Sequence, residues 1–136
     1  MLHILSVVAA FAPAFSYALW TRRLSQDDPG LLQRIYTVAA PNERRVNATA
    51  LVLAGLFGLV LVARNDQIFK FDQAWVNLAI LTWFAMSGVL HGMLLPAERK
   101  VARGDVTAAD RVDLGGMILS LLAVFMLYLM VWKPGL

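Results

Sequence analysis

The chain has 136 residues, of which 60% are hydrophobic and 15% charged, and its mean hydropathy is +0.66. A soluble domain of this length could not bury so much apolar surface, so lipid must solvate much of the chain. The net charge of +3 does not indicate nucleic-acid binding, because the basic residues flank apolar runs. The absence of cysteine excludes a disulfide framework, a thiolate metal site and an iron–sulfur cluster.

Four apolar runs are long enough to cross a hydrocarbon core about 30 Å thick. They cover residues 2–20, 46–63, 75–95 and 114–132. Backbone groups in lipid must be hydrogen-bonded within their own segment, so each run is predicted to be a helix. The sequence therefore predicts an all-α, membrane-embedded four-helix bundle in which residues 1–136 form a single integral membrane domain.

The charges around these runs predict an orientation. No basic residue precedes the first run, which argues for a spanning helix and against a signal peptide. Most lysines and arginines lie in the loops after the first and third runs: Arg22, Arg23, Arg34, Arg44 and Arg45, and Arg99, Lys100, Arg103 and Arg111. By the positive-inside rule these loops face the cytoplasm, and both termini lie outside a bacterial-type inner membrane.

The first loop contains a predicted short amphipathic helix. Asp28 is expected to cap its N-terminus and Pro29 to occupy its first position. Apolar residues follow at helical spacing: Leu31, Leu32, Ile35, Val38 and Ala39. Such a helix would lie along the cytoplasmic face. It would either contact lipid or a partner, or connect the first two spans while its apolar side packs against the bundle.

Small residues four positions apart mark the predicted contacts between helices. Lipid tails are as apolar as leucine, so membrane helices associate through close packing, for which small side chains leave room. The predicted contact residues are Ala50, Ala54 and Gly58 in the second span, Gly88 and Gly92 in the third, and Gly116 and Ser120 in the fourth.

His91 is an ionisable residue within a predicted span, which makes it a candidate functional residue. At 3.6 residues per turn, one side of the third span consists of Asn77, Leu81, Phe84, Ser87, Gly88, His91 and Gly92. This side is predicted to face the bundle interior, where Ser87, Asn77 or Asn47 could hold His91 by a hydrogen bond. His91 would then be either a functional group or a structural residue that sets the helix register.

The two histidines, His3 and His91, raise the question of metal and haem binding. The predicted topology places His3 at the outer surface and His91 in the cytoplasmic half of the third span, so one subunit would not bring both to one haem iron. A copper site is the other reading, because His3, Met126 and Met130 offer an imidazole and two soft thioethers. The opening Met-Leu-His also offers a square-planar nitrogen set for Cu(II) or Ni(II). Methionine at helical spacing is usually packing material, and no cofactor is predicted.

Four stretches together resemble a known family. They are “LHILSVVAAFAPAFSYALW”, “ERRVNATALVLAGLFGLVLV”, “AWVNLAILTWFAMSGVLHGMLLPAERK” and “MVWKPG”. Over nearly its whole length the chain resembles the predicted four-helix integral membrane proteins of domain-of-unknown-function family 2269. The resemblance implies the four-span topology. It does not indicate an activity, because the biochemistry of that family is unassigned. The position of His3 is also similar to that of a histidine in copper-resistance membrane domains and membrane protoporphyrinogen oxidases, although no lysine lies within a span as a second catalytic group.

Catalysis is not indicated by the sequence. No carboxylate lies within a predicted span, and the serines at 16, 87 and 120 have no evident catalytic partner. The small-residue stripes favour an accessory or assembly subunit of a larger membrane complex, or a homo-oligomer, in contact with the lipid bilayer and other membrane subunits. The alternative is a haem- or copper-handling membrane protein that uses His91, or His3 with Met126 and Met130.

Overall fold

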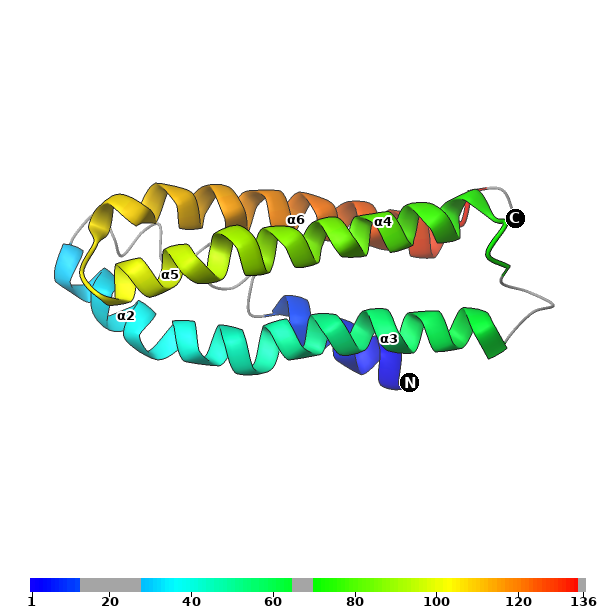
Figure 1. Cartoon of the computed structure of the whole chain (residues 1–136), viewed down its shortest axis with the longest axis horizontal. Coiled ribbons are helices and arrows are strands. Elements are labelled where there is room, and N and C mark those ends of the chain that lie inside the picture. Colours follow the sequence, from blue (N-terminus) through cyan, green and yellow to red (C-terminus); the bar gives the residue numbers. More distant parts are fainter. Residues whose placement is uncertain (13–27, 65–69, 135–136) are drawn as a thin grey trace.

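The computed structural model describes residues 1–12, 28–64 and 70–134, and the regular structure within these ranges is helical (Figure 1). A first helix covers Leu2–Ala12. The other α-helices are α2 (Pro29–Asn42), α3 (Ala48–Arg64), α4 (Ala74–Val89), α5 (Leu95–Ala102) and α6 (Ala109–Trp132). Two π-helical segments, η1 (Glu43–Asn47) and η2 (Leu90–Leu94), and a 3₁₀ turn, η3 (Val106–Ala108), join them. Residues 13–20 of the first predicted span, with Arg22 and Arg23 after it, lie outside the described residues.

Consecutive elements join into three long helices, Gly30–Arg64, Ala74–Ala102 and Val106–Trp132. Each of them is long and apolar enough to cross a membrane, judged by length and composition. The first helix, Leu2–Ala12, is apolar but shorter. Within the described ranges the chain therefore has three helices able to span a bilayer. The first predicted span, 2–20, depends partly on residues 13–20, which lie outside the described residues.

Helix α2 begins where the sequence predicts. The carboxylate of Asp28 accepts a hydrogen bond from the backbone N–H of Gly30 at 2.8 Å, and Pro29 occupies the first helical position. The buried residues of α2 are Leu32, Tyr36, Ala39 and Ala40. This side packs against α5. Helix α2 continues through η1 into α3, so it forms the N-terminal part of the same long helix that contains the second predicted span.

Each of the two longest helices contains a π-helical turn next to a proline. Pro41 lies just before η1, and Pro96 lies just after η2. Proline has no backbone N–H and so interrupts the i→i−4 hydrogen bonds of a regular helix. The turn η2 contains Gly92, whose carbonyl would pair with the missing N–H of Pro96, whereas η1 follows Pro41. Each π turn shifts the register of the residues beyond it.

The side of α4 that faces the bundle is opposite to the predicted side. Its buried residues are Trp75, Val76, Ala79, Thr82 and Met86. Leu81 and Phe84, which were expected inside, are 64% and 61% exposed, and Asn77 is exposed as well. The buried side of α4 packs against α6 and α3, whereas an added Cβ atom at Gly88 or Gly92 would meet nothing within 4 Å.

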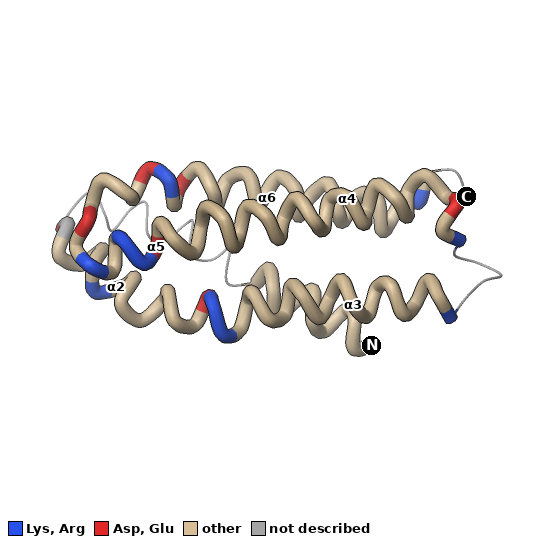
Figure 2. The backbone as a smooth tube through the Cα atoms, in the orientation of Figure 1, with Lys and Arg blue, Asp and Glu red and all other residues tan. Residues whose placement is uncertain are grey.

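Charged residues gather at the end of the bundle formed by α2, α5 and the start of α6 (Figure 2). At this end Asp105 caps η3, because its carboxylate accepts hydrogen bonds from the hydroxyl and the backbone N–H of Thr107. The bond from the hydroxyl is the main reason that the pKa of Asp105 lies below its ordinary value. The uneven distribution of charge is the feature on which the predicted orientation rests.

Candidate functional site

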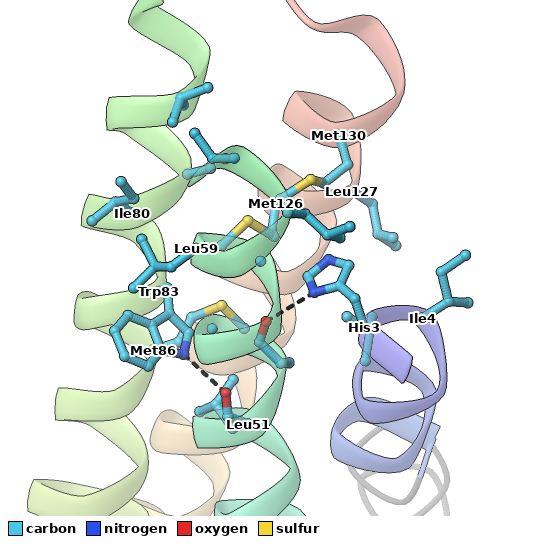
Figure 3. A pocket seen from close by; sticks show the side chains of 18 of the residues that line it. His3, Ile4, Leu51, Leu59, Ile80, Trp83, Met86, Met126, Leu127 and Met130 are labelled. Carbon is cyan, nitrogen blue, oxygen red and sulfur yellow. Dashed lines mark hydrogen bonds between the residues drawn. The ribbon is translucent and has the colours of Figure 1, made fainter. Parts of the chain in front are cut away.

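An apolar cavity of about 430 Å³ lies between the first helix, α3, α4 and α6. Aliphatic and aromatic side chains form most of its walls, and His3 and several methionines reach into it (Figure 3). A concave apolar site with a few polar groups is the usual form of a small-ligand site in proteins. This cavity is therefore the first candidate site.

His3 is held at one wall of the cavity. Its Nδ1 atom lies 2.8 Å from the backbone carbonyl oxygen of Ala54. The carbonyl can only accept a hydrogen bond, so Nδ1 carries the proton and the lone pair of the neutral ring is on Nε2. Gly58 makes room for the ring, because a Cβ atom there would lie 3.2 Å from Cε1 of His3. A histidine whose other ring nitrogen donates to a carbonyl has the arrangement typical of metal-binding histidines.

The depth of His3 differs from the sequence prediction. Its partner Ala54 lies on α3 about 15 Å before the end of that helix at Arg64, so His3 is beside the middle of α3 and not level with that end. The reason is that the first helix starts beside the middle of α3 (Figure 1). The opening residues also do not form a square-planar nitrogen set, because Leu5 donates its N–H to the carbonyl of Met1 and Nδ1 of His3 is already used.

Thioether sulfur atoms gather around the same cavity. Four of the six methionines of the chain line it: Met1, Met86, Met126 and Met130. Met126 and Met130 are one turn apart on α6, and Figure 3 shows their side chains reaching toward the same space as the ring of His3. The cavity therefore brings together the three residues that the sequence suggested as copper ligands.

Trp83 forms the wall of the cavity on α4. Its indole N–H donates a hydrogen bond to the carbonyl oxygen of Leu51 at 2.9 Å. The indole ring lies against Gly55, where an added Cβ atom would overlap it. Gly55 therefore allows α3 to approach α4 at this point.

His91 lies at a second cleft of about 470 Å³, separate from the cavity around His3. Its side chain is exposed, which corrects the prediction that it faces the bundle interior. The reason is that His91 lies on the outward side of α4 and η2, opposite the buried side chains of these helices. Its Nδ1 donates to the carbonyl oxygen of Ser87 at 2.9 Å, and Arg44 and Arg99 line the same cleft.

The predicted polar partners are not assembled around His91. Asn77 donates to the carbonyl oxygen of Phe71 at 3.1 Å, and Asn47 donates to the carboxylate of Glu43. The hydroxyl oxygen of Ser87 is buried and has no hydrogen-bond partner in the described part of the chain. With one histidine at each cavity, the described arrangement does not place both on one haem iron.

Two buried carboxylates were not predicted from the sequence. Glu43 in η1 and Glu98 in α5 are each 6% exposed, and they interact electrostatically with each other. Asn47 donates a hydrogen bond to Glu43, whereas Oε2 of Glu98 has no partner among the described residues. The signal that could have found them is a repeated pattern, “PNERR” at 41–45 and “PAERK” at 96–100. It places a glutamate two residues after each proline that interrupts a helix.

The small residues of the predicted contacts divide into two groups. In the second span, Ala50 and Ala54 are buried and Gly58 lies against His3. Ser120 in the fourth span donates its hydroxyl to a carbonyl of its own helix. An added Cβ atom would meet nothing within 4 Å at three glycines, Gly88, Gly92 and Gly116. These three therefore make no close helix contact within the described chain.

The features above define a helical membrane protein with an apolar cavity. Among residues 1–12, 28–64 and 70–134, no group of three or more His, Cys, Asp or Glu side chains could hold a metal ion.

Comparison with known proteins gives one partial likeness. Over 85 residues the chain is 36% identical to a probable transporter of Streptomyces coelicolor, and the match covers 59% of this chain and 19% of that protein. The chain thus spans less than a fifth of the length of that relative. No family model matches the chain, so the resemblance to domain-of-unknown-function family 2269 stays a prediction. No solved structure matches it.

Proposed function

We propose that the chain is a four-span subunit of a larger membrane assembly and acts through contacts between its helices and those of a partner or a second copy. Four spans result if the first helix continues through residues 13–20, as the apolar run predicts. Both termini then lie outside a bacterial-type inner membrane, because the basic loops face the cytoplasm. The partial relative supports a modular role, since the matched segment there is a small part of a longer probable transporter.

The observation that carries this proposal is the outward side of α4 and η2. In the most apolar 18-residue segment of each long helix, only 22–33% of the residues are buried within the chain. Most of each segment therefore meets lipid or another protein. The outward side combines the open glycines Gly88 and Gly92 with the exposed side chains of Leu81 and Phe84. Glycines beside bulky residues form a groove that a neighbouring helix can enter.

A crosslinking experiment tests this assembly. The chain has no cysteine, so a Leu81→Cys variant can be crosslinked in native membranes with a thiol-directed photoreactive reagent. We expect a discrete crosslinked product, and adding Gly88→Leu and Gly92→Leu should reduce its yield by about tenfold, because leucine side chains would fill the groove. The control is Leu56→Cys on the exposed side of α3. Equal crosslinking from positions 81 and 56 would exclude the α4 groove as the contact.

A second candidate function, the handling of Cu(I), is favoured by the cavity around His3. The sulfur atoms of Met126 and Met130 are neutral, soft donors that suit Cu(I), and the Nε2 atom of His3 is a neutral imidazole nitrogen that also suits copper. No carboxylate lines this cavity in the described chain, so hard cations such as Ca²⁺ and Mg²⁺ are poorly served. This candidate does not require a partner.

Silver(I) tests the second candidate, since it is a redox-inert ion with ligand preferences like those of Cu(I). The purified chain should bind stoichiometric Ag(I), and Met126→Leu with Met130→Leu should weaken binding on the order of tenfold or more. Leucine has nearly the volume of methionine, so the fold is kept. The control is Met93→Leu with Met117→Leu, which lie outside the cavity. Equal affinities of the two double variants would eliminate this function.

A further inference from the structure

The repeated pattern after Pro41 and Pro96 sets an arginine beside each buried glutamate. Arg44 follows Glu43, and Arg99 follows Glu98. Consecutive residues of a helix point about 100° apart, so an arginine next to an inward glutamate can point out of the bundle. Both glutamates are buried and both arginines are exposed. The two copies of the pattern thus give each helix one acidic residue inside and two successive basic residues outside.

The two arginines line one cleft, although they come from different helices. The cleft of about 470 Å³ receives Arg44 from η1 and Arg99 from α5, and it is also lined by His91 of η2 and Thr49 of α3. No acidic side chain of the described residues lines it. The cleft therefore combines two guanidinium groups, an imidazole and a hydroxyl, with no carboxylate facing them.

The cleft lies where the apolar runs meet the charged end of the bundle. Arg44 comes just before the second predicted span, 46–63, and Arg99 comes just after the third, 75–95. Figure 2 shows basic residues at the corresponding end of the bundle. Lipid phosphates lie just outside the hydrocarbon core. A membrane-embedded chain would therefore hold this cleft near the level of the headgroups.

We propose that this cleft binds a phosphate group, namely that of an anionic lipid headgroup. A guanidinium is planar and presents paired N–H donors that match two phosphate oxygens, so Arg44 and Arg99 can hold the phosphate from two sides. Nδ1 of His91 donates to the carbonyl of Ser87, which leaves Nε2 to accept a hydrogen bond from a headgroup hydroxyl. The cleft shares the outward side of η2 with the surface proposed for assembly, but its test uses the purified chain and requires no partner.

Phosphatidylglycerol is the probe for this site. The purified full chain is titrated with short-chain phosphatidylglycerol or phosphatidylcholine in detergent, and bound lipid is counted by native mass spectrometry. We expect a preference for phosphatidylglycerol on the order of tenfold, which Arg44→Gln with Arg99→Gln should abolish. The matched control is Arg45→Gln with Lys100→Gln. It removes the same charge one residue further along each helix, from side chains that do not line the cleft, so it should keep the preference.

Three further results decide the proposal. Equal loss in both double variants would overturn it, because attraction would then come from net charge alone. A wild-type chain without any preference for phosphatidylglycerol would also overturn it. Inorganic phosphate is titrated in phosphatidylcholine as a separate arm. Saturable binding there that Arg44→Gln with Arg99→Gln removes would support the phosphate site and assign it to a soluble anion.

Discussion

Replacing Glu98 with methionine is expected to raise the free energy of unfolding by about 1–3 kcal/mol. Glu98 is buried and its Oε2 has no hydrogen-bond partner among the described residues, so its carboxylate has lost water without an equivalent replacement. Methionine fills a similar volume without charge, and the change also removes the electrostatic interaction with Glu43. The thermal midpoint of the purified chain in detergent should rise by several degrees, on the order of 2–8 °C.

Asn47→Leu, beside the other buried glutamate, is expected to have the opposite effect on stability. It removes the donor that hydrogen-bonds the buried carboxylate of Glu43, so it should lower the free energy of unfolding by about 1–3 kcal/mol. A lower midpoint for Glu98→Met would contradict the expected result and show that this carboxylate has a stabilising partner. A higher midpoint would show that the chain keeps Glu98 against its own stability, which points to a functional reason for the residue.

The positions of the long helices could be predicted because the thickness of the hydrocarbon core sets the length of the apolar run that crosses it. Three of the predicted spans, 46–63, 75–95 and 114–132, fall inside helices of the structure. The helices extend beyond these runs, since α2 and α5 pack against each other outside them. Polar residues in those extensions carry no hydropathy signal, so the extra length could not be read from the apolar runs.

The inward side of α4 could not be predicted, because both of its sides are apolar. Gly88 and Gly92 mark a surface that a helix can approach closely, but this rule does not say whether that helix belongs to the same chain. The structure places Trp83 and Met86 toward α3 and α6 and leaves the glycines open. His91 was placed wrongly for the same reason, as it lies on the glycine side of the helix.

The two candidate sites differ in how far the sequence could describe them. The donor chemistry of His3, Met126 and Met130 was readable from residue type, but their common cavity depends on where the first helix meets α3. The cluster of Glu43 and Glu98 depends on two π turns, which shift the register in a way that a regular helical repeat does not reproduce. The repeated proline and glutamate pattern becomes informative only when both copies are known to lie at such turns.

Gly55→Ala is expected to lower the free energy of unfolding by about 1–3 kcal/mol, although alanine is the better helix former. An added Cβ atom would overlap the indole ring of Trp83. The ring cannot move away freely, because its N–H donates to the carbonyl of Leu51 and the side chain is large and rigid. Either α3 and α4 separate or this hydrogen bond breaks, and both outcomes should shift tryptophan fluorescence together with the thermal midpoint.

The matched control for this change is Gly88→Ala, at a glycine where an added Cβ atom meets nothing within 4 Å. It makes the same chemical change in a neighbouring helix and should leave the thermal midpoint unchanged or slightly higher, because alanine favours a helix over glycine by up to about 1 kcal/mol. Equal midpoints for the two variants would show that α3 does not approach α4 at Gly55. If Gly88→Ala instead lowers the midpoint at high protein concentration and not at low concentration, then the glycine side of α4 is already in contact with a second copy, because only association depends on concentration.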